Sequence, residues 1–262
     1  MNRAKEITIY DLAEKLNISV ATVSRALKDD PVVSKKTKKK IADLAEALGY
    51  RSNHFAHNLR DQCTNNIGVI VPRLNSYFMS AVTAGIESEA NNKGYNLIIS
   101  QSSKSFEKEL ESTKTMFNNR VDGLLVSLAY DTKRIDHFDV FFKRKIPVIF
   151  FDSVIGHEYS PNILIDNRKA AYDVTTHLIS QGCKRIVHIT AMSNRNVYVD
   201  RFHSYKQALQ ENRIPFRENY VLANNLSQEE GERAAKKLLQ MKPLPDQYHY
   251  CAIGSGHSQF VA

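Results

Sequence analysis

Apolar side chains recur at helical spacing in three short segments near the N-terminus. They are Ile9, Leu12, Ala13 and Leu16 in the first segment, Val23, Ala26 and Leu27 in the second, and Ile41, Leu44, Ala45 and Leu48 in the third. This spacing is typical of amphipathic helices that bury one face. Because only the short turn "NIS" separates the first two segments, the pattern predicts a helix-turn-helix domain.

Hydroxyl residues stand where each of these helices should begin. Thr8 precedes the first helix, with Asp11 in its first turn, and Ser19 and Ser34 precede the second and third. A Ser or Thr side chain in this position accepts a hydrogen bond from a free backbone N–H of the first turn. Gly49 is a natural residue for the position just beyond the third helix, where left-handed backbone is common.

The second helix has a face that the predicted core does not use. Its residues are Val20, Ala21, Ser24, Arg25 and Lys28. In a helix-turn-helix domain the second helix enters the major groove, where an arginine can pair with O6 and N7 of guanine, worth about 1–3 kcal/mol of discrimination. Val20 and Ala21 suit apolar contacts such as a thymine methyl, and the Thr22 and Ser24 hydroxyls suit phosphate. The alternative for Arg25 is an ordinary solvated arginine.

Positive charge is concentrated in the same part of the chain. Residues 1–60 hold 12 Lys/Arg against 7 Asp/Glu, so they carry +5 of the net charge of +8. The excess suits a polyanionic partner, although a solubilising surface explains charge alone equally well. The lysines at 35, 36, 38, 39 and 40 are interpreted as a solvated helix face.

Other features exclude several classes of protein. Cys63, Cys183 and Cys251 form neither a zinc pattern nor a disulfide framework, and no long apolar run is present. We therefore predict a cytoplasmic protein with no metal, no cofactor and no membrane partner. Without a phosphate-binding loop, a dinucleotide fingerprint or a recognisable nucleophile–base pair, we also predict no enzymatic activity.

The pattern changes at Ile67 to short apolar runs that alternate with amphipathic segments. Strands are predicted over 67–72, 95–100, 122–128 and 146–152, with helices over 77–93, 105–119 and 132–144. A second set has strands over 162–167, 185–190 and 220–225, and helices over 168–181, 201–212 and 228–241. This alternation predicts two lobes with parallel sheets flanked by helices, joined by a crossover around 153–161.

Ligands of such sheets bind beyond the carboxyl ends of the strands. That edge is predicted to bear Asn75, Tyr77, Phe78, Ser127, Asp152 and the loop that holds Arg195. A strand-end carboxylate that caps a turn is an equally good explanation of Asp152. A two-lobed domain with a cleft is also typical of a solute-binding protein of the periplasmic sugar-receptor type. The helix-turn-helix segment and the missing signal peptide argue against that alternative.

The motif "TIYDLAEKLNISVATVSRAL", followed by "VSKKTKKKIADLAEALGY", closely resembles the DNA-binding domain of the lac repressor family of bacterial transcription regulators. The resemblance continues to about Asp246. It implies an all-α helix-turn-helix domain and a two-lobed, periplasmic-binding-protein-like α/β domain. It also implies base-reading residues at Val20, Ala21 and Arg25, and a hinge in which Leu59, beside Ala56, enters the minor groove of DNA. Ser52 and His57 replace a usual proline and arginine of that hinge.

The resemblance further implies a small effector, such as a sugar, a sugar phosphate or a nucleobase, in the cleft. Arg201 corresponds to the arginine that grips polyols or anions. The implied effector residues are Asn75, Tyr77, Phe78, Ser127, Asp152, Arg195, Asn196 and Arg201. The candidate DNA-binding residues are Thr8, Ser19, Val20, Ala21, Thr22, Ser24, Arg25, Asn53, Ala56, His57 and Leu59.

We therefore expect an effector-controlled repressor that binds a pseudo-palindromic, double-stranded operator as a homodimer. The predicted divisions are a DNA-binding domain over 1–50, a hinge over 51–65, a first lobe over 66–158, a partial second lobe over 159–246 and an atypical tail over 247–262. The tail shows no strand or helix period, and we interpret it as a truncated or frame-shifted terminus; a divergent but genuine end is the alternative.

Overall fold

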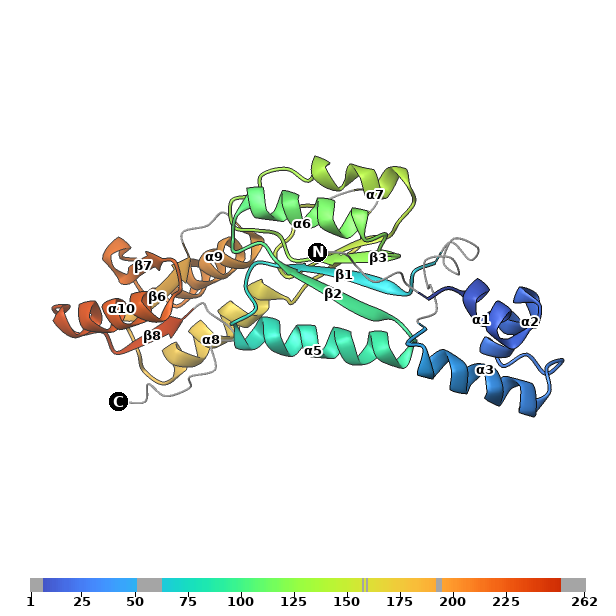
Figure 1. The fold of residues 1–262 in the computed structure, drawn as a ribbon. Coiled ribbons are helices and arrows are strands. Elements are labelled where there is room, and N and C mark those ends of the chain that lie inside the picture. Colours follow the sequence, from blue (N-terminus) through green and yellow to red (C-terminus); the bar gives the residue numbers. More distant parts are fainter. Residues whose placement is uncertain (1–6, 51–62, 157, 159, 192–194, 251–262) are drawn as a thin grey trace. The chain divides into compact units, whose positions relative to one another are not determined.

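The computed structural model describes residues 7–50, 63–156, 158, 160–191 and 195–250 (Figure 1). The chain divides into two compact units, Met1–Thr64 and Asn65–Ala262. The first is helical and the second contains two parallel sheets flanked by helices. The predicted fold class is confirmed.

The first unit consists of α1 (Ile9–Leu16), α2 (Val20–Leu27) and α3 (Lys35–Ala47), as the apolar spacing predicts. Thr8 and Asp11 form a reciprocal capping box, and the Ser19 hydroxyl accepts a hydrogen bond from the backbone N–H of Thr22 at 3.1 Å. Gly49 follows α3 with a φ of +64°, and the next N–H closes the helix on the carbonyl of Ala45 at 2.8 Å. Local capping chemistry therefore sets the ends of these helices.

The helices of this unit share one small core. Its buried members are Leu12, Ala13, Val23, Ala26, Val33, Ile41 and Ala45. Leu27, predicted to lie on the buried face of α2, is instead 39% exposed. It is the last residue of α2, and Val33, from the segment that follows, contributes a buried side chain to the same core.

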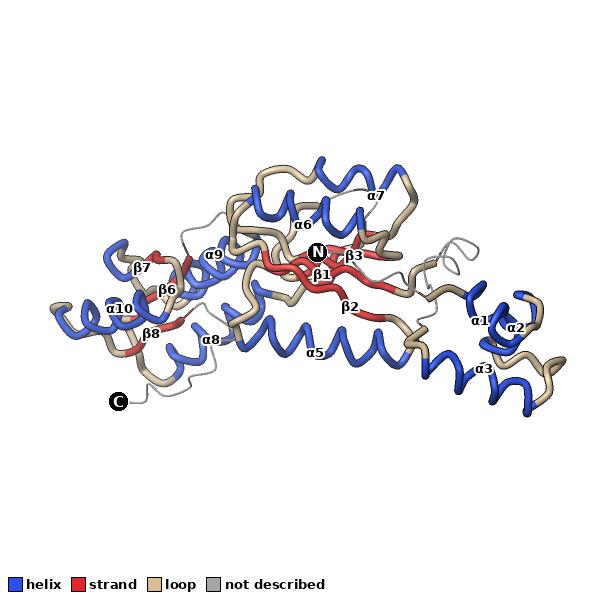
Figure 2. The backbone as a smooth tube through the Cα atoms, in the orientation of Figure 1, coloured by secondary structure: helices blue, strands red, loops and turns tan. Residues whose placement is uncertain are grey.

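The first sheet of the second unit has five parallel strands in the order β2-β1-β3-β4-β5 (Figure 2). Its strands are β1 (Asn66–Val71), β2 (Asn96–Gln101), β3 (Gly123–Val126), β4 (Val148–Phe151) and β5 (Asn162–Ile163). Its helices are α5 (Tyr77–Asn92), α6 (Phe106–Asn118), the 3-10 turn η1 (Asp136–Phe138) and α7 (Asp139–Lys143).

Side chains of each strand alternate between the two faces of this sheet. Ile70 packs with Met116 of α6 and Phe141 of α7, whereas Val69 and Val71 belong to the cluster that contains Met79 of α5. Figure 1 accordingly shows α5 on one face and α6 and α7 on the other. Burial on both faces explains why the inner strands β1, β3 and β4 are almost continuously apolar.

The second sheet has three parallel strands in the order β7-β6-β8. Its strands are β6 (Ile186–Ala191), β7 (Val221–Asn224) and β8 (Gln247–Tyr250), and its flanking elements are α8 (Asn167–Ser180), α9 (Asn196–Glu211), the 3-10 turn η2 (Glu218–Tyr220) and α10 (Gln228–Gln240). Ile186 packs with Tyr205 of α9, while Val187 packs with Ala234 of α10, so this sheet is also covered on both faces.

Three predicted elements differ from the structure. The strand predicted over 162–167 is only β5, and it pairs with β4 of the first sheet instead of opening the second set. The remaining residues turn into α8, which the Asp166 carboxylate caps at the N–H of Lys169. The helix predicted over 132–144 is confined to η1 and α7, and α9 begins five residues earlier than predicted.

The prediction of no strand after Asp246 is wrong for residues 247–250, which form β8 beside β6. Asp246 explains the join, because its carboxylate accepts the N–H groups of Lys184 and Arg185, both at 2.8 Å, immediately before β6. A pairing set by contacts some 60 residues apart leaves no local pattern in the sequence.

Gly68 in β1 gives a first test of this packing. A Cβ at Gly68 would lie 2.8 Å from Leu124 Cδ1 and 3.0 Å from Met116 Sδ, so Gly68→Ala should lower the free energy of unfolding by about 1–3 kcal/mol. The matched control is Gly85→Ala in α5, where no atom lies within 4 Å of the new Cβ and helix propensity predicts a gain of up to about 1 kcal/mol. Chemical denaturation measures both; equal effects would contradict the packing.

Candidate functional site

Helix α2 presents two different faces. Val23 and Ala26 are buried, while Ala21 and Arg25 are exposed and Val20 is half-buried. The guanidinium of Arg25 makes no hydrogen bond or ion pair with any side chain or backbone group of the described residues. The exposed face is therefore free to contact another molecule.

Three of the hydroxyl groups predicted to contact DNA, those of Thr8, Ser19 and Thr22, already have intramolecular partners. The Ser19 Oγ lies 2.8 Å from the Thr22 Oγ1 in addition to accepting the Thr22 N–H. The Thr8 hydroxyl donates to the Asp11 carboxylate at 2.6 Å. Ser24 is half-buried on α2. The first role of Thr8 and Ser19 is thus to cap helices, and any contact with phosphate would be shared with that role.

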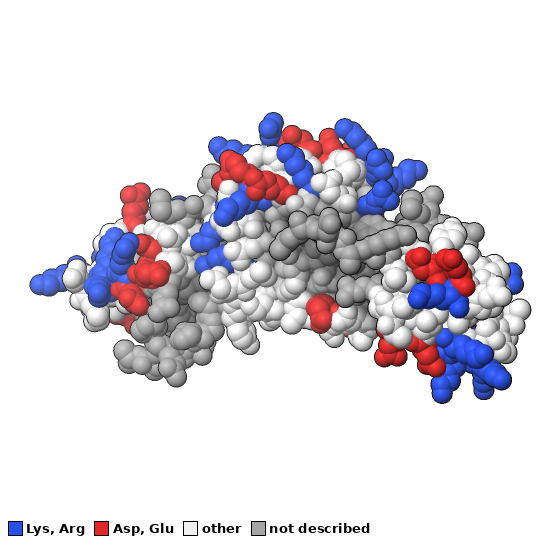
Figure 3. Space-filling model, viewed as in Figure 1, with Lys and Arg blue, Asp and Glu red and all other residues white. Residues whose placement is uncertain are grey.

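Lysines gather on the first half of α3, where Figure 3 shows a dense basic patch. Lys38 is partnered: its Nζ lies 2.6 Å from Asp29 Oδ1 and 2.8 Å from the Asp29 carbonyl. Lys35, Lys36, Lys39 and Lys40 are exposed. The predicted hinge residues Asn53, Ala56, His57 and Leu59 lie outside the described residues.

Within the second unit, Ser127 and Asp152 meet at the carboxyl ends of β3 and β4. The Ser127 hydroxyl, fully buried, lies 3.4 Å from Asp152 Oδ2. Burial raises the pKa of Asp152 to about 6, against the opposing effects of the Arg201 charge and the Ser127 hydrogen bond. Asp152 also has a φ of +57°, an unusual backbone conformation that occurs at binding and catalytic sites.

Three predicted residues belong to α9 and its N-cap, and two of them, Asn196 and Arg201, interact with Asp152. Asn196 uses its whole amide: Nδ2 donates to the Asp152 carbonyl and Oδ1 accepts from the Val154 N–H, both at 3.0 Å. Arg201 is buried, and its Nε donates to Asn167 Oδ1 at 2.8 Å. Arg195 is buried as well, and burial lowers its pKa.

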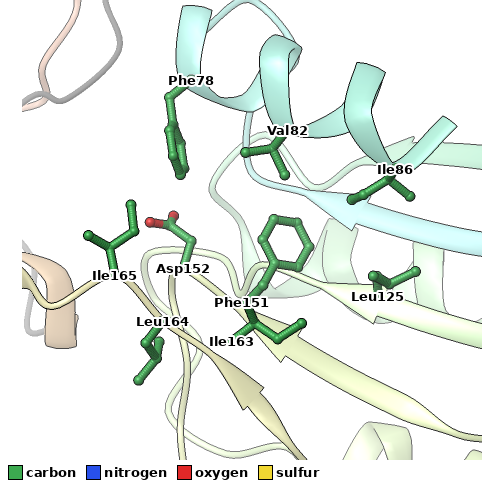
Figure 4. A pocket seen from close by; sticks show the side chains of 9 residues that line it. All are labelled: Phe78, Val82, Ile86, Leu125, Phe151, Asp152, Ile163, Leu164 and Ile165. Atoms are coloured by element: carbon green, nitrogen blue, oxygen red, sulfur yellow. The ribbon is translucent and has the colours of Figure 1, made fainter. Parts of the chain in front are cut away.

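The structure does not bring all predicted effector residues together. Asn75 is exposed and Tyr77 is 69% exposed at the start of α5. Phe78 and Asp152 do share a cavity of about 280 Å³ on the α5 face of the first sheet. Figure 4 shows the Asp152 carboxylate directed between Phe78 and Ile165, with the apolar lining behind it. Asp152 is the only charged residue of that lining.

Three residues of this region were not predicted from the sequence. Asn167 orients Arg201 from the first turn of α8, and the hydroxyls of Tyr130 and Tyr198 lie 2.9 Å apart. Tyr198 was detectable as a neighbour of Arg195 and Asn196 in "NRNVYVDRF". Nothing in the local pattern distinguishes Asn167 or Tyr130.

The described part of the chain contains neither a candidate membrane span nor a candidate metal cluster. None of the described helices combines the length and the hydrophobicity that a membrane-spanning helix requires. No group of three or more His, Cys, Asp or Glu residues there could hold a metal ion.

A helix-turn-helix unit followed by a unit with two parallel sheets is the architecture of an effector-binding transcription regulator. Residues 8–53 match the family described as bacterial regulatory proteins, lacI family, and residues 64–254 match the periplasmic binding proteins and sugar binding domain of LacI family. The chain belongs to the LacI family and is a DNA-binding transcription regulator controlled by an effector; regulators of this family are not enzymes.

Individual relatives agree with this assignment. The chain is 32% identical to catabolite control protein A of Priestia megaterium over 91% of its own length and 72% of that protein. It is 33% identical to the regulator RegA of Clostridium saccharobutylicum over 78% of this chain and 61% of RegA. It shares the fold of the lac repressor dimer solved with operator and the anti-inducer ONPF, with a TM-score of 0.76, 22% identity and coverage of 94% and 74%.

Asp152 gives a pH-dependent prediction. Its folded-state pKa of about 6 lies above the ordinary 3.8, so the folded protein loses stability as the pH rises through this range and the carboxyl ionises. Asp152→Asn removes that ionisation and should stabilise the second unit above pH 6 by on the order of 1 kcal/mol, with the gain shrinking toward pH 4.

Denaturation of wild type and variant between pH 4 and pH 8 measures this effect. Asp136→Asn is the control, because Asp136 is exposed in a surface ion pair with Arg134 and should change stability little at any pH. A difference for Asp152→Asn that stays constant with pH would contradict the raised pKa.

Proposed function

We propose that the chain is a repressor that reads a pseudo-palindromic operator with two copies of α2. The observation that carries this proposal is Arg25, exposed on the face of α2 opposite the buried Val23 and Ala26. The planar guanidinium of Arg25 can donate two hydrogen bonds to a guanine in the major groove, while the small Ala21 permits close approach to the bases. Exposed lysines of α3 add attraction to phosphate. Because operator DNA lies in the bacterial cytoplasm, the protein should act there.

Two half-sites require two copies of the chain. The lac repressor structure whose fold this chain shares is a dimer on operator, and a two-fold symmetric protein matches a two-fold symmetric site. We therefore propose a homodimer, with Leu59 of each copy inserted at the central minor-groove step. An apolar insertion of this kind costs a few kcal/mol per unstacked step, which the wider contact surface offsets.

The effector is proposed to be a sugar or related polyol that binds beside Asp152 and Arg201. A carboxylate close to an arginine guanidinium can form hydrogen bonds with several hydroxyl groups of such a ligand. Asn167 and Asn196 hold this region in place, because one orients Arg201 and the other fixes the backbone around Asp152. The description of residues 64–254 as related to sugar-binding domains supports this class of ligand.

Arg25→Ala tests base reading. After selection of an operator from random DNA, the variant should lose about 10- to 100-fold in affinity for that operator while keeping its weak, salt-sensitive affinity for unrelated DNA. Lys28→Ala, which removes a charge from the exposed end of the same helix, is the control and should weaken binding to both DNAs alike. An equal loss for Arg25→Ala on both DNAs would assign Arg25 to phosphate instead.

Arg201→Lys tests the effector site. Lysine keeps the charge but lacks the planar fork, so a sugar that raises the unfolding temperature of the wild type should bind the variant at least about tenfold more weakly. Asn75→Ala, at an exposed position, is the control that should retain most affinity. Isothermal titration with that sugar measures both; unchanged binding by Arg201→Lys would move the site elsewhere.

A further inference from the structure

A carboxylate is fully buried outside the sites described above. Glu109 lies on α6, and its side chain accepts three hydrogen bonds: from the N–H of Ala129 at 2.5 Å, the hydroxyl of Thr132 at 2.9 Å and the Nε2 of His137 at 3.0 Å. Burial of an unpaired carboxylate would cost several kcal/mol, so these donors make the burial of Glu109 possible.

All three donors belong to one segment, residues 129–137, which begins after β3 and ends within η1. A second tie joins the same segment to the start of α6, because the Asp131 carboxylate accepts the N–H of Phe106 at 2.7 Å. The segment contains little regular structure before η1. Its position is therefore set by α6, with Glu109 making most of the contacts.

The segment that Glu109 holds contacts α9 and its N-cap in the second lobe. Tyr130 Oη lies 2.9 Å from Tyr198 Oη, and the Tyr130 carbonyl accepts from Arg195 Nε at 3.4 Å. The two tyrosine rings also meet edge to face, with centroids 5.9 Å apart. Ser127, a candidate effector residue, lies just before this segment.

Other contacts between the lobes reach a different part of the second lobe. Arg73 Nη1 donates to the Leu226 carbonyl at 3.2 Å, and Lys104 Nζ donates to the Asn225 carbonyl at 2.9 Å. Those two carbonyls follow β7, whereas Tyr198 and Arg195 belong to α9 and its N-cap. The lobes therefore meet at several places. Residues 129–137 contact Tyr198 and Arg195, while Asn196 contacts the backbone of Asp152 and Val154. Lys104 contacts Asn225 and also lies over the Tyr130 ring, with its Nζ 5.1 Å from the ring centroid.

We propose that Glu109 is a positioning residue for the contact between the lobes. By holding Ala129, Thr132 and His137, it places Tyr130 against Tyr198 and Arg195, and so links the first-lobe core to the helix that bears Arg201. This inference rests on the proposed function for its role in effector control, because a rearrangement of the lobes on binding would pass through this contact.

Hydrogen exchange of the effector-free, DNA-free chain tests the link. Glu109→Gln puts an amide N–H₂ where an acceptor is needed, so it should loosen residues 129–137 and also speed exchange in the first two turns of α9 by about fivefold, the worth of roughly one hydrogen bond. Exchange in β7 should not change. Glu111→Gln, an exposed carboxylate on the same helix, is the matched control and should alter neither region.

A double-variant cycle separates positioning from a general structural role. Tyr130→Phe should speed exchange in α9 to a similar extent, and adding it to Glu109→Gln should produce little further change, because both act through the same contact. Additive effects, or an unchanged α9 in Glu109→Gln, would overturn the proposal. If Glu109→Gln does not fold, Thr132→Val removes a single donor to Glu109 and is judged by the same two criteria.

The outcome is independent of ligand and operator. If sugars prove not to bind while α9 responds as expected, the proposed effector is wrong but the positioning role stands. If sugars bind through Arg201 while α9 does not respond, only the positioning role fails.

Discussion

Burial of one face of α2 is the constraint on which DNA recognition depends. Helix α2 has only eight residues, too few to be stable by its own propensity. Val23 and Ala26 anchor it in the core of the first unit. At its start, the Ser19 hydroxyl accepts a hydrogen bond from the backbone N–H of Thr22, which has no partner within the helix. Because these contacts fix the rotation of the helix about its axis, they also determine that Arg25 points outward.

The same dependence explains what could be predicted from sequence. Caps and apolar stripes are local features, so α1, α2 and α3 were predictable almost to the residue, including the turn at Gly49. The inner strands were predictable because both of their faces are buried. By contrast, β5 and β8 lie at sheet edges; β5 has only two residues, and β8 pairs with β6, about 60 residues earlier in the chain. Ile163, Leu164 and Ile165 read as a core strand, yet all three are exposed.

The candidate effector region divides in the same way. Asp152 and Ser127 were predictable because strand ends in a parallel sheet meet at one edge. Asn167 and Tyr130 were not, since their importance comes only from the residues that the fold places opposite them: Arg201 for the first, Tyr198 and Arg195 for the second. A side chain that orients another leaves no periodic signal, whereas the oriented residue often stands in a recognisable motif.

The hydrogen bonds that Asn196 and Arg201 already make within the protein limit how a ligand can bind to them. The side-chain amide of Asn196 already hydrogen-bonds to the Asp152 carbonyl and the Val154 N–H. The Nε of Arg201 already donates to Asn167. A ligand that displaced these bonds would gain little net free energy from its own. It gains more by adding acceptors to the guanidinium and donors to Asp152 while the existing bonds hold those groups still. Effector control then requires that one arrangement of the lobes offer these contacts better than another, because a ligand with equal affinity for both would shift neither. Residues that set the arrangement without touching the ligand are therefore as important for control as those that bind it.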